Sequence, residues 1–384
     1  MKPPPTGKFW GDAYVNQFTN TVEDNFSENL LDHYIPLDGA TSQSPIIDTE
    51  LTKEMLSSLQ ENTLEKRLAS FRNIIDLEIG DTPLTRARNI EREFNIRNLY
   101  LKFEGGNPTG THKDRIAFAQ VHDALRRGYD SMTLATCGNY GVAMALGCYL
   151  AGLTCNVYIP EGYHTKRIQE MQKFGAKVFF AGRDYEEACL ISRERALREE
   201  TYDANPGGAN SALQMEAYAQ IAYEIYDDLR DAPAVVAVPV SNGTALAGIH
   251  LGFVSLYRRA KTSRIPKMIA GSSYKKNPII ESFLQKSPVC KDLQPERIQE
   301  TVINEPLINW HSSDGQPALD SIYKSQGFAS YVSDRSLKES KKILRDKEGL
   351  LVLPAATAGL SAFIQQHQIT PFAGDRYVVI ITGK

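Results

Sequence analysis

The sequence has few features that would point to a membrane, a nucleic acid or an export signal. No apolar run approaches the roughly 20 residues that a membrane-spanning helix needs. The start of the chain, MKPPPTGKFWGD, has no apolar h-region of a signal peptide. Lysine and arginine number 43 against 46 aspartates and glutamates, which gives a net charge of -3. Charges of both signs are dispersed along the chain, so no segment is expected to attract nucleic acid or lipid headgroups. We therefore expect a cytoplasmic protein with no nucleic-acid or membrane partner.

Cysteine is also scarce, and its distribution argues against two further classes of protein. The five cysteines show no spacing typical of a metal site, and an odd number cannot all pair with one another. We expect reduced thiols, as in a cytosolic protein, and no metal ion. The cysteines are Cys137, Cys148, Cys155, Cys189 and Cys290.

From residue 98 onward, short apolar runs alternate with amphipathic stretches. A chain of 384 residues suits two lobes, and this alternation calls for parallel sheets with right-handed crossovers. The predicted fold class is α/β, with two open, mostly parallel sheet domains, flanking helices and an active site in the cleft between them. Strands are expected at 98–104, 131–136, 155–160, 177–182, 234–240, 267–272 and 377–382. Helices are expected at 113–128, 140–152, 164–175, 184–200, 210–230, 335–347 and 357–367, with an earlier one at 48–70.

One lysine stands where a helix begins. The segment KFEGGNPTGTHKDR is a strand end followed by a turn, and it places Lys113 in the first turn of the next helix. The macrodipole and desolvation both lower the pKa of an amine there, which makes it a competent nucleophile. A lysine that merely points to solvent is the alternative. The following Asp114 and Arg115 can form an ion pair that anchors the turn.

A second segment, TCGNYG at 136–141, also lies between a strand and a helix. Its backbone N–H groups and the Thr136 hydroxyl can receive a carboxylate at the helix N-terminus. The amide of Asn139 suits a ring hydroxyl. Such turns are often only turns, so this segment gains weight from the others.

The third segment, SNGTA at 241–245, follows a buried strand and opens a helix. Consecutive N–H groups and two hydroxyls form a nest for a phosphate dianion. The segment has neither the Gly-Lys-Ser/Thr of a Walker motif nor G-x-G-x-x-G, so a small phosphate fits better than a nucleotide.

The fourth segment is the strand YVVIIT, which ends at Thr382. A hydroxyl there can pair with a neutral ring nitrogen, although a threonine that simply ends a strand is an equal alternative. All four segments fall at carboxyl ends of predicted strands, so they can converge on one cleft.

With these residues in view, the chain resembles the fold-type-II pyridoxal-phosphate enzymes, and the threonine-synthase-like group in particular. The similarity runs from GDTPL at 80–84 to TG at 382–383. NPTGTHKDR is similar to the family's NPTGSFKDR, and VPVSNGT is similar to its phosphate loop. The resemblance implies pyridoxal 5'-phosphate as cofactor, with Lys113 as the Schiff-base lysine and catalytic acid and base.

The resemblance also assigns expected roles around the cofactor. Asn139 would face the ring hydroxyl, the 241–245 loop would hold the phosphate, and Thr382 would meet the pyridine nitrogen. The cofactor-binding residues are then Lys113, Asn139, Ser241, Asn242, Gly243, Thr244, Ala245 and Thr382. The expected substrate-binding residues are Thr136, Cys137, Gly138, Asn139, His112, Lys166 and Lys275.

Several positions depart from the threonine-synthase pattern. His112 stands where phenylalanine is usual, and Ser241, Thr244 and Ala245 replace Gly, Gly and Asn. The segment LPAATA at 353–358 lacks the glutamate of the family's EPASA. These departures concern the substrate more than the cofactor.

Three functions therefore stand as hypotheses. The first is a lyase that converts O-phosphohomoserine to threonine and phosphate. The second is a β-replacement or β-elimination enzyme on a serine-, phosphoserine- or cysteine-type substrate, similar to cysteate, cysteine or diaminopropionate synthases or to Ser/Thr dehydratases. The third, of another class, is a non-catalytic scaffold that binds pyridoxal phosphate.

The resemblance suggests a domain division and an assembly. Residues 1–75 would form an arm and a helix, and 116–204 a smaller mobile α/β domain. Residues 76–115 and 205–384 would form the larger cofactor-binding domain. Relatives are commonly dimeric, so we expect a homodimer in which residues 1–45 can be an exchanged arm.

Overall fold

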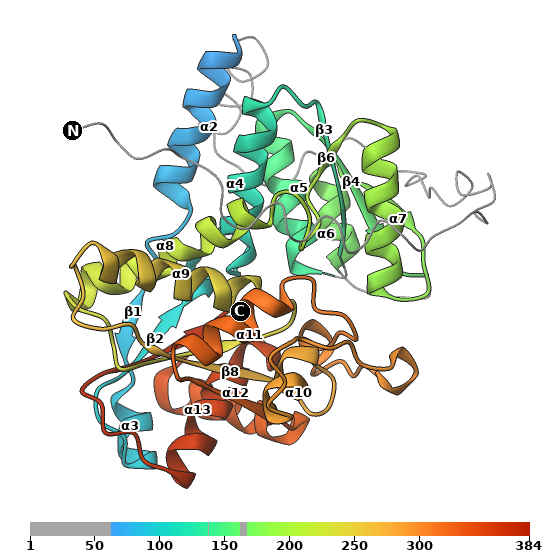
Figure 1. The fold of residues 1–384 in the computed structure, drawn as a ribbon. Helices are drawn as coiled ribbons and strands as arrows, with labels where there is room; N and C mark the ends of the chain where they lie inside the picture. Colours follow the sequence, from blue (N-terminus) through green and yellow to red (C-terminus); the bar gives the residue numbers. More distant parts are fainter. Residues whose placement is uncertain (1–62, 137, 162–166) are drawn as a thin grey trace.

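The computed structural model describes residues 63–136, 138–161 and 167–384 (Figure 1). The predicted arm at 1–45, most of the helix predicted at 48–70, and Cys137 and Lys166 lie outside these residues.

A four-stranded parallel sheet forms the upper half of the view in Figure 1. Its strand order is β5 (Lys177–Phe180), β4 (Thr154–Ile159), β3 (Ser131–Ala135), β6 (Tyr202–Asp203). The helices of this half are α4 (Lys113–Arg126), α5 (Asn139–Ala151), α6 (Arg167–Lys173) and α7 (Tyr185–Arg198).

A six-stranded sheet forms the lower half, and only its β1–β2 pair is antiparallel. Its order is β1 (Leu84–Arg86), β2 (Leu99–Phe103), β10 (Tyr377–Ile381), β7 (Val235–Pro239), β8 (Lys267–Ser273), β9 (Phe328–Val332). The associated helices are α3 (Arg88–Phe94), α8 (Ser211–Leu229), α9 (Thr244–Arg258), α10 (Pro278–Leu284), α11 (Gly315–Lys324), α12 (Asp334–Glu348) and α13 (Ala358–Ile369). Short 3-10 turns are η3 (Glu104–Gly106), η4 (Pro295–Arg297), η5 (Glu305–Leu307) and η6 (Ala355–Thr357).

The central strands explain why the sequence folds into this sheet. Every residue of β7, VVAVP, and of β10, YVVII, is buried. Continuous apolar runs of this kind belong to parallel strands that are covered on both faces. Helices α8 and α9 pack against each other at the junction of the two halves (Figure 1).

The predicted fold class, an α/β protein with two mostly parallel sheets, is confirmed. Strands β1, β6 and β9 were not predicted, and each is an edge strand with few buried apolar residues. The helix expected to end at residue 70 is wrong in its bounds, since α2 spans Leu64–Glu78. Its extension buries Phe71, whose ring stacks on Phe118 of α4 at 5.7 Å between centroids.

The described residues contain neither a membrane-spanning helix nor a cluster of metal ligands. None of their helices is both long and apolar enough to cross a membrane. No group of three or more His, Cys, Asp or Glu residues among them is arranged to hold a metal ion.

Candidate active site

Three of the four predicted segments follow neighbouring strands of the six-stranded sheet. Strand β10 lies between β2 and β7, with Ile381 paired to Phe103 and Val379 paired to Ala237. Thr382 therefore leaves the sheet between the turn that leads to Lys113 and the loop at 241–245. An antiparallel bridge between Thr111 and Gly383 joins the turn before Lys113 to the residue that follows Thr382.

Lys113 is the first residue of α4 and is partly buried. Desolvation lowers the pKa of its amine to about 8, and the charge of Asp314 opposes part of this shift. The predicted lowering is thus confirmed, and desolvation is its main cause. The amine lies over the ring of Tyr140, 5.7 Å from the centroid, so an aromatic face forms one wall of its surroundings.

His112 is fixed beside the lysine. Burial lowers its pKa well below the ordinary value, and the charge of Lys113 adds to this effect, so the ring is neutral. Its Nδ1 lies 3.0 Å from the carbonyl oxygen of Thr382, which can only accept, so Nδ1 carries the proton. The ring also stacks on Tyr218 at 5.3 Å. His112 is therefore a hydrogen-bonded packing residue with Nε2 left as its basic nitrogen.

The residues after the lysine anchor the helix differently from the prediction. Asp114 accepts hydrogen bonds from the backbone N–H of Thr109 at 2.9 Å and from its hydroxyl at 2.7 Å. Arg115 instead pairs with Glu104 of η3 and Glu224 of α8, each at 2.6 Å. The predicted Asp114–Arg115 ion pair is wrong, because Thr109 of the preceding turn holds Asp114, and Glu104 and Glu224 hold Arg115.

The second segment begins α5. Thr136 is buried at the end of β3, and its hydroxyl oxygen accepts the N–H of Gly138 at 3.2 Å. Asn139 is the first residue of the helix. Among the residues that the structure describes, a Cβ added to Gly138 would meet no atom within 4 Å, so they leave open space beside this helix start. A carboxylate can reach the N-terminal N–H groups from that space.

The third segment joins β7 to α9. Gly243 has a φ of +95°, a left-handed conformation that strains residues with a Cβ. The side-chain oxygen of Asn242 accepts the N–H of Ser313 and a bond from Asn309, both at 3.3 Å. The Thr244 hydroxyl donates to the carboxylate of Asp314 at 2.5 Å. Of the two hydroxyls expected to serve a phosphate, that of Thr244 thus has a protein partner.

The structure does not bring Lys275 to the other predicted residues. Lys275 is exposed, and its ammonium lies over the ring of the exposed Tyr274 at 5.4 Å. The side chain of Asn277, two residues further on, does reach the 241–245 loop, because its amide donates to the carbonyl oxygen of Ser241 at 3.0 Å.

Sequence reasoning missed two residues of this site, Tyr140 and Asp314. The Tyr140 hydroxyl donates to the carbonyl oxygen of Ala204 at 2.6 Å and accepts a hydrogen bond from Gln120 at 2.5 Å. These two bonds fix the ring over which the Lys113 amine lies. Its position inside the TCGNYG turn was a usable signal. Asp314 follows no strand and belongs to no recognised motif, so the sequence offered no signal for it.

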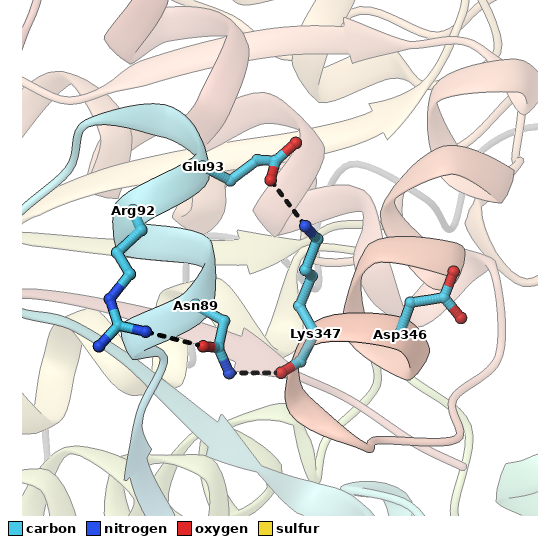
Figure 2. A pocket seen from close by; sticks show the side chains of 5 residues that line it. All are labelled: Asn89, Arg92, Glu93, Asp346 and Lys347. Atoms are coloured by element: carbon cyan, nitrogen blue, oxygen red, sulfur yellow. Dashed lines mark hydrogen bonds and ion pairs between the residues drawn. The ribbon is translucent and has the colours of Figure 1, made fainter.

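A separate surface pocket of about 400 Å³ lies between α3 and α12 (Figure 2). Its side chains interact with one another: Lys347 pairs with Glu93 at 2.8 Å, and Asn89 donates to the Lys347 carbonyl oxygen at 2.6 Å. None of the predicted site residues lines this pocket. It therefore offers no support for a second reactive centre.

Comparison with known proteins identifies the family. The model of the family described as pyridoxal-phosphate dependent enzyme matches residues 75–383. Threonine synthase of Methanocaldococcus jannaschii is 32% identical over 315 residues, which cover 81% of this chain and 76% of the relative. Threonine synthase of Synechocystis is 27% identical over 314 residues, covering 81% and 78%.

Solved structures agree on the fold. Maize serine racemase has a TM-score of 0.68 at 15% identity, over 83% of this chain and 92% of its own. Threonine deaminase isoform 2 of Solanum lycopersicum has a TM-score of 0.66 at 16% identity, over 88% and 90%.

The residues present fit the cofactor of this family. Lys113 offers a desolvated amine whose pKa is lowered to about 8, which increases the neutral fraction that can bond to an aldehyde. The start of α9 offers N–H groups for a phosphate, and Thr382 lies between these two elements. The chain therefore belongs to the pyridoxal-phosphate dependent enzymes and is threonine-synthase-like in sequence.

Proposed function

We propose that this lyase converts O-phosphohomoserine and water to threonine and phosphate. The amine of Lys113 carries the proposal, because it stands at the start of α4 with its pKa lowered to about 8. Sequence similarity to threonine synthases over about four fifths of the chain supports the choice of reaction.

Pyridoxal phosphate, when bound, supplies an electron sink for bonds at the α-carbon of an amino acid. Lys113 holds the cofactor before the reaction and then moves protons at Cα and Cβ of the substrate, as a group with a pKa of about 8 can do in both directions. The N–H groups at the start of α5, with Thr136, orient the substrate carboxylate. Asn139 and Thr382 contact the ring, and Ser241 to Ala245 hold the phosphate.

The reaction can be tested with O-phosphohomoserine as substrate. Threonine and inorganic phosphate should appear in equal amounts, measured by amino-acid chromatography and a phosphate assay. Release of phosphate with a 2-oxo acid in place of threonine would contradict the water-addition step. No release of phosphate at all would contradict the proposal as a whole.

A β-replacement or β-elimination enzyme is the second candidate. The exposed position of Lys275, over Tyr274, favours it, because the side chain offered for a substrate phosphate lies on the surface. Serine, O-phosphoserine and cysteine, assayed in parallel with and without added thiol or sulfite, separate this candidate from the first. Turnover of any of these in preference to O-phosphohomoserine would favour it.

Attachment of the cofactor should depend on pH. Only the neutral amine of Lys113 can attack an aldehyde, and its pKa is about 8. The rate of attachment should therefore rise about tenfold per pH unit up to pH 8 and then level off. Stopped-flow absorbance on the apo-protein measures this rate. A rate that still climbs steeply between pH 9 and 10 would contradict the lowered pKa.

We also propose a cytoplasmic homodimer whose smaller domain, residues 116–204, moves relative to the rest. The free thiols of Cys148, Cys155 and Cys189 suit a reducing compartment. Light scattering on the purified chain gives the assembly state, and a monomeric mass would contradict it.

A further inference from the structure

Asp314 is a buried carboxylate attached to the phosphate loop. It precedes α11 and is 3% exposed. Its Oδ2 accepts the hydroxyl of Thr244 at 2.5 Å, and its backbone N–H donates to the carbonyl oxygen of Asn242 at 3.0 Å. A Cβ on Gly243 would lie 2.7 Å from the Asp314 carbonyl oxygen. The backbone of Asp314 is thus packed against Asn242 and Gly243 of the loop, while its carboxylate is bonded to Thr244.

The same carboxylate acts on the reactive lysine. Its charge raises the pKa of Lys113 against the larger effect of desolvation, and it is bonded to Thr244 of the loop at the same time. A cofactor bonded to Lys113 with its phosphate in the loop would therefore come under the influence of this carboxylate.

Groups from four different elements act on the charge of Asp314. Burial raises its pKa, while the hydrogen bond from Thr244 of α9, the Ser211 hydroxyl of α8 and the charges of Arg193 of α7 and Lys113 of α4 act in the opposite direction. Once Lys113 is bonded to an aldehyde and the phosphate dianion is in the loop, Asp314 has gained a negative neighbour.

We propose that Asp314 controls the affinity for the cofactor phosphate. Its carboxylate repels the phosphate dianion, so Asp314 takes up one proton when the phosphate binds. The protonated side chain then has an O–H that can donate to the phosphate. The Thr244 hydroxyl has a single proton and directs it to Asp314, so the loop binds the phosphate through its N–H groups and Ser241. This inference depends on the cofactor and not on which amino acid the enzyme converts.

The contrast between pyridoxal phosphate and pyridoxal isolates the effect. Both form the same bond with Lys113, but pyridoxal carries no phosphate, so the ratio of their dissociation constants reports the phosphate alone. Two unit charges a few Å apart at an effective dielectric constant of about 20 change an affinity by tenfold or more. Asp314→Asn, which keeps the shape and can still accept the Thr244 hydroxyl, should therefore improve this ratio at least about tenfold at pH 8.5.

The pH dependence of the ratio in the unaltered protein provides a second measurement. A phosphate monoester is mostly a dianion above its second pKa of about 6. If the complex holds one more proton than its separate components, the preference for pyridoxal phosphate falls as pH rises from 6.5 to 8.5. In Asp314→Asn the preference should stay level or rise.

Both constants are measured by absorbance titration of the full-length apo-protein, with its thermal midpoint as a check on folding. Asp320→Asn, which removes a charge from the outer part of α11, is the matched control and should leave the ratio within about twofold. A worse ratio in Asp314→Asn would show that Asp314 only braces the loop and would overturn the proposal. An unchanged ratio would do the same. If the variant does not fold, the unaltered protein still provides the test. A ratio of the two dissociation constants that does not change between pH 6.5 and 8.5 would refute the coupling of phosphate binding to proton uptake.

Discussion

Replacing Lys113 with alanine should abolish covalent attachment of the cofactor and lower turnover by at least about a thousandfold. The side chain combines two roles, because it is both the amine that bonds the cofactor and the acid and base at Cα and Cβ. Proton transfer by a positioned group contributes about 10² to 10⁴ in rate by itself, and loss of the nucleophile removes a further contribution. Turnover is measured with O-phosphohomoserine, and attachment by the visible band that borohydride abolishes.

Two control variants make this result specific. Lys113→Arg keeps the positive charge, but its guanidinium stays protonated and cannot bond the aldehyde, so it should be as inactive as the alanine variant. Lys177→Ala removes an exposed lysine of β5 and should have no effect on either measurement. Unchanged turnover in Lys113→Ala would contradict both enzymatic functions, because each of them requires this lysine.

Local sequence patterns predicted the parts of the structure that local physics determines. The apolar runs of β7 and β10 are bounded by turns and buried on both faces, so their identity and limits follow from the residues themselves. Lys113 and Asn139 each begin a helix directly after such a strand and turn, which is how the sequence located them. The contact of the Lys113 amine with the ring of Tyr140 brings the starts of these two helices together.

The rest depends on contacts between residues far apart in the chain. Asp314 meets Thr244 across 70 residues, and Arg115 meets Glu224 across 109. A carboxylate carries no local sign of a partner that is far away in the sequence, so the pattern of charges favoured the adjacent Asp114 for Arg115 instead. Edge strands β1 and β9 escaped prediction for a related reason, because their partial exposure removes the apolar run that marks a central strand.

The ion pairs of Arg115, two residues after Lys113, should make Glu224 essential for stability. The Glu224 carboxylate contacts Lys102 and Arg115 at 2.6 Å each, and Arg115 also contacts Glu104 at 2.6 Å. Lys102, Arg115 and Glu104 are nearly inaccessible to solvent. Two cations balance two carboxylates in this cluster, and removing one carboxylate leaves a buried positive charge without a partner. Glu224→Gln should therefore lower the free energy of unfolding by about 3 to 5 kcal/mol.

The pH dependence of this loss follows from the pKa of Glu224. Burial alone would raise it, but the hydrogen bond and charge of Arg115, with the charge of Lys102, hold it at about 2. A folded-state pKa below the unfolded value stabilises the protein above the unfolded value, and this contribution disappears as pH falls toward 2. A depression from the ordinary 4.5 to about 2 corresponds to roughly 3 kcal/mol. The two proteins should therefore differ most above pH 5 and become more alike as pH falls from about 5 toward 3.

Urea unfolding of Glu224→Gln and the unaltered protein across this pH range measures both effects. The control is Glu339→Gln, because its ion pair with Arg335 is 57% and 88% exposed on α12. Exposed pairs one helical turn apart contribute about 0.3 to 0.5 kcal/mol, so this variant should be nearly unchanged. Because Arg115 lies in the first turn of α4 with Lys113, Glu224→Gln should also slow cofactor attachment. A loss below about 1 kcal/mol at pH 7 would mean that solvent or a rearranged neighbour replaces the lost charge, and the cluster would not be what holds the lysine in place.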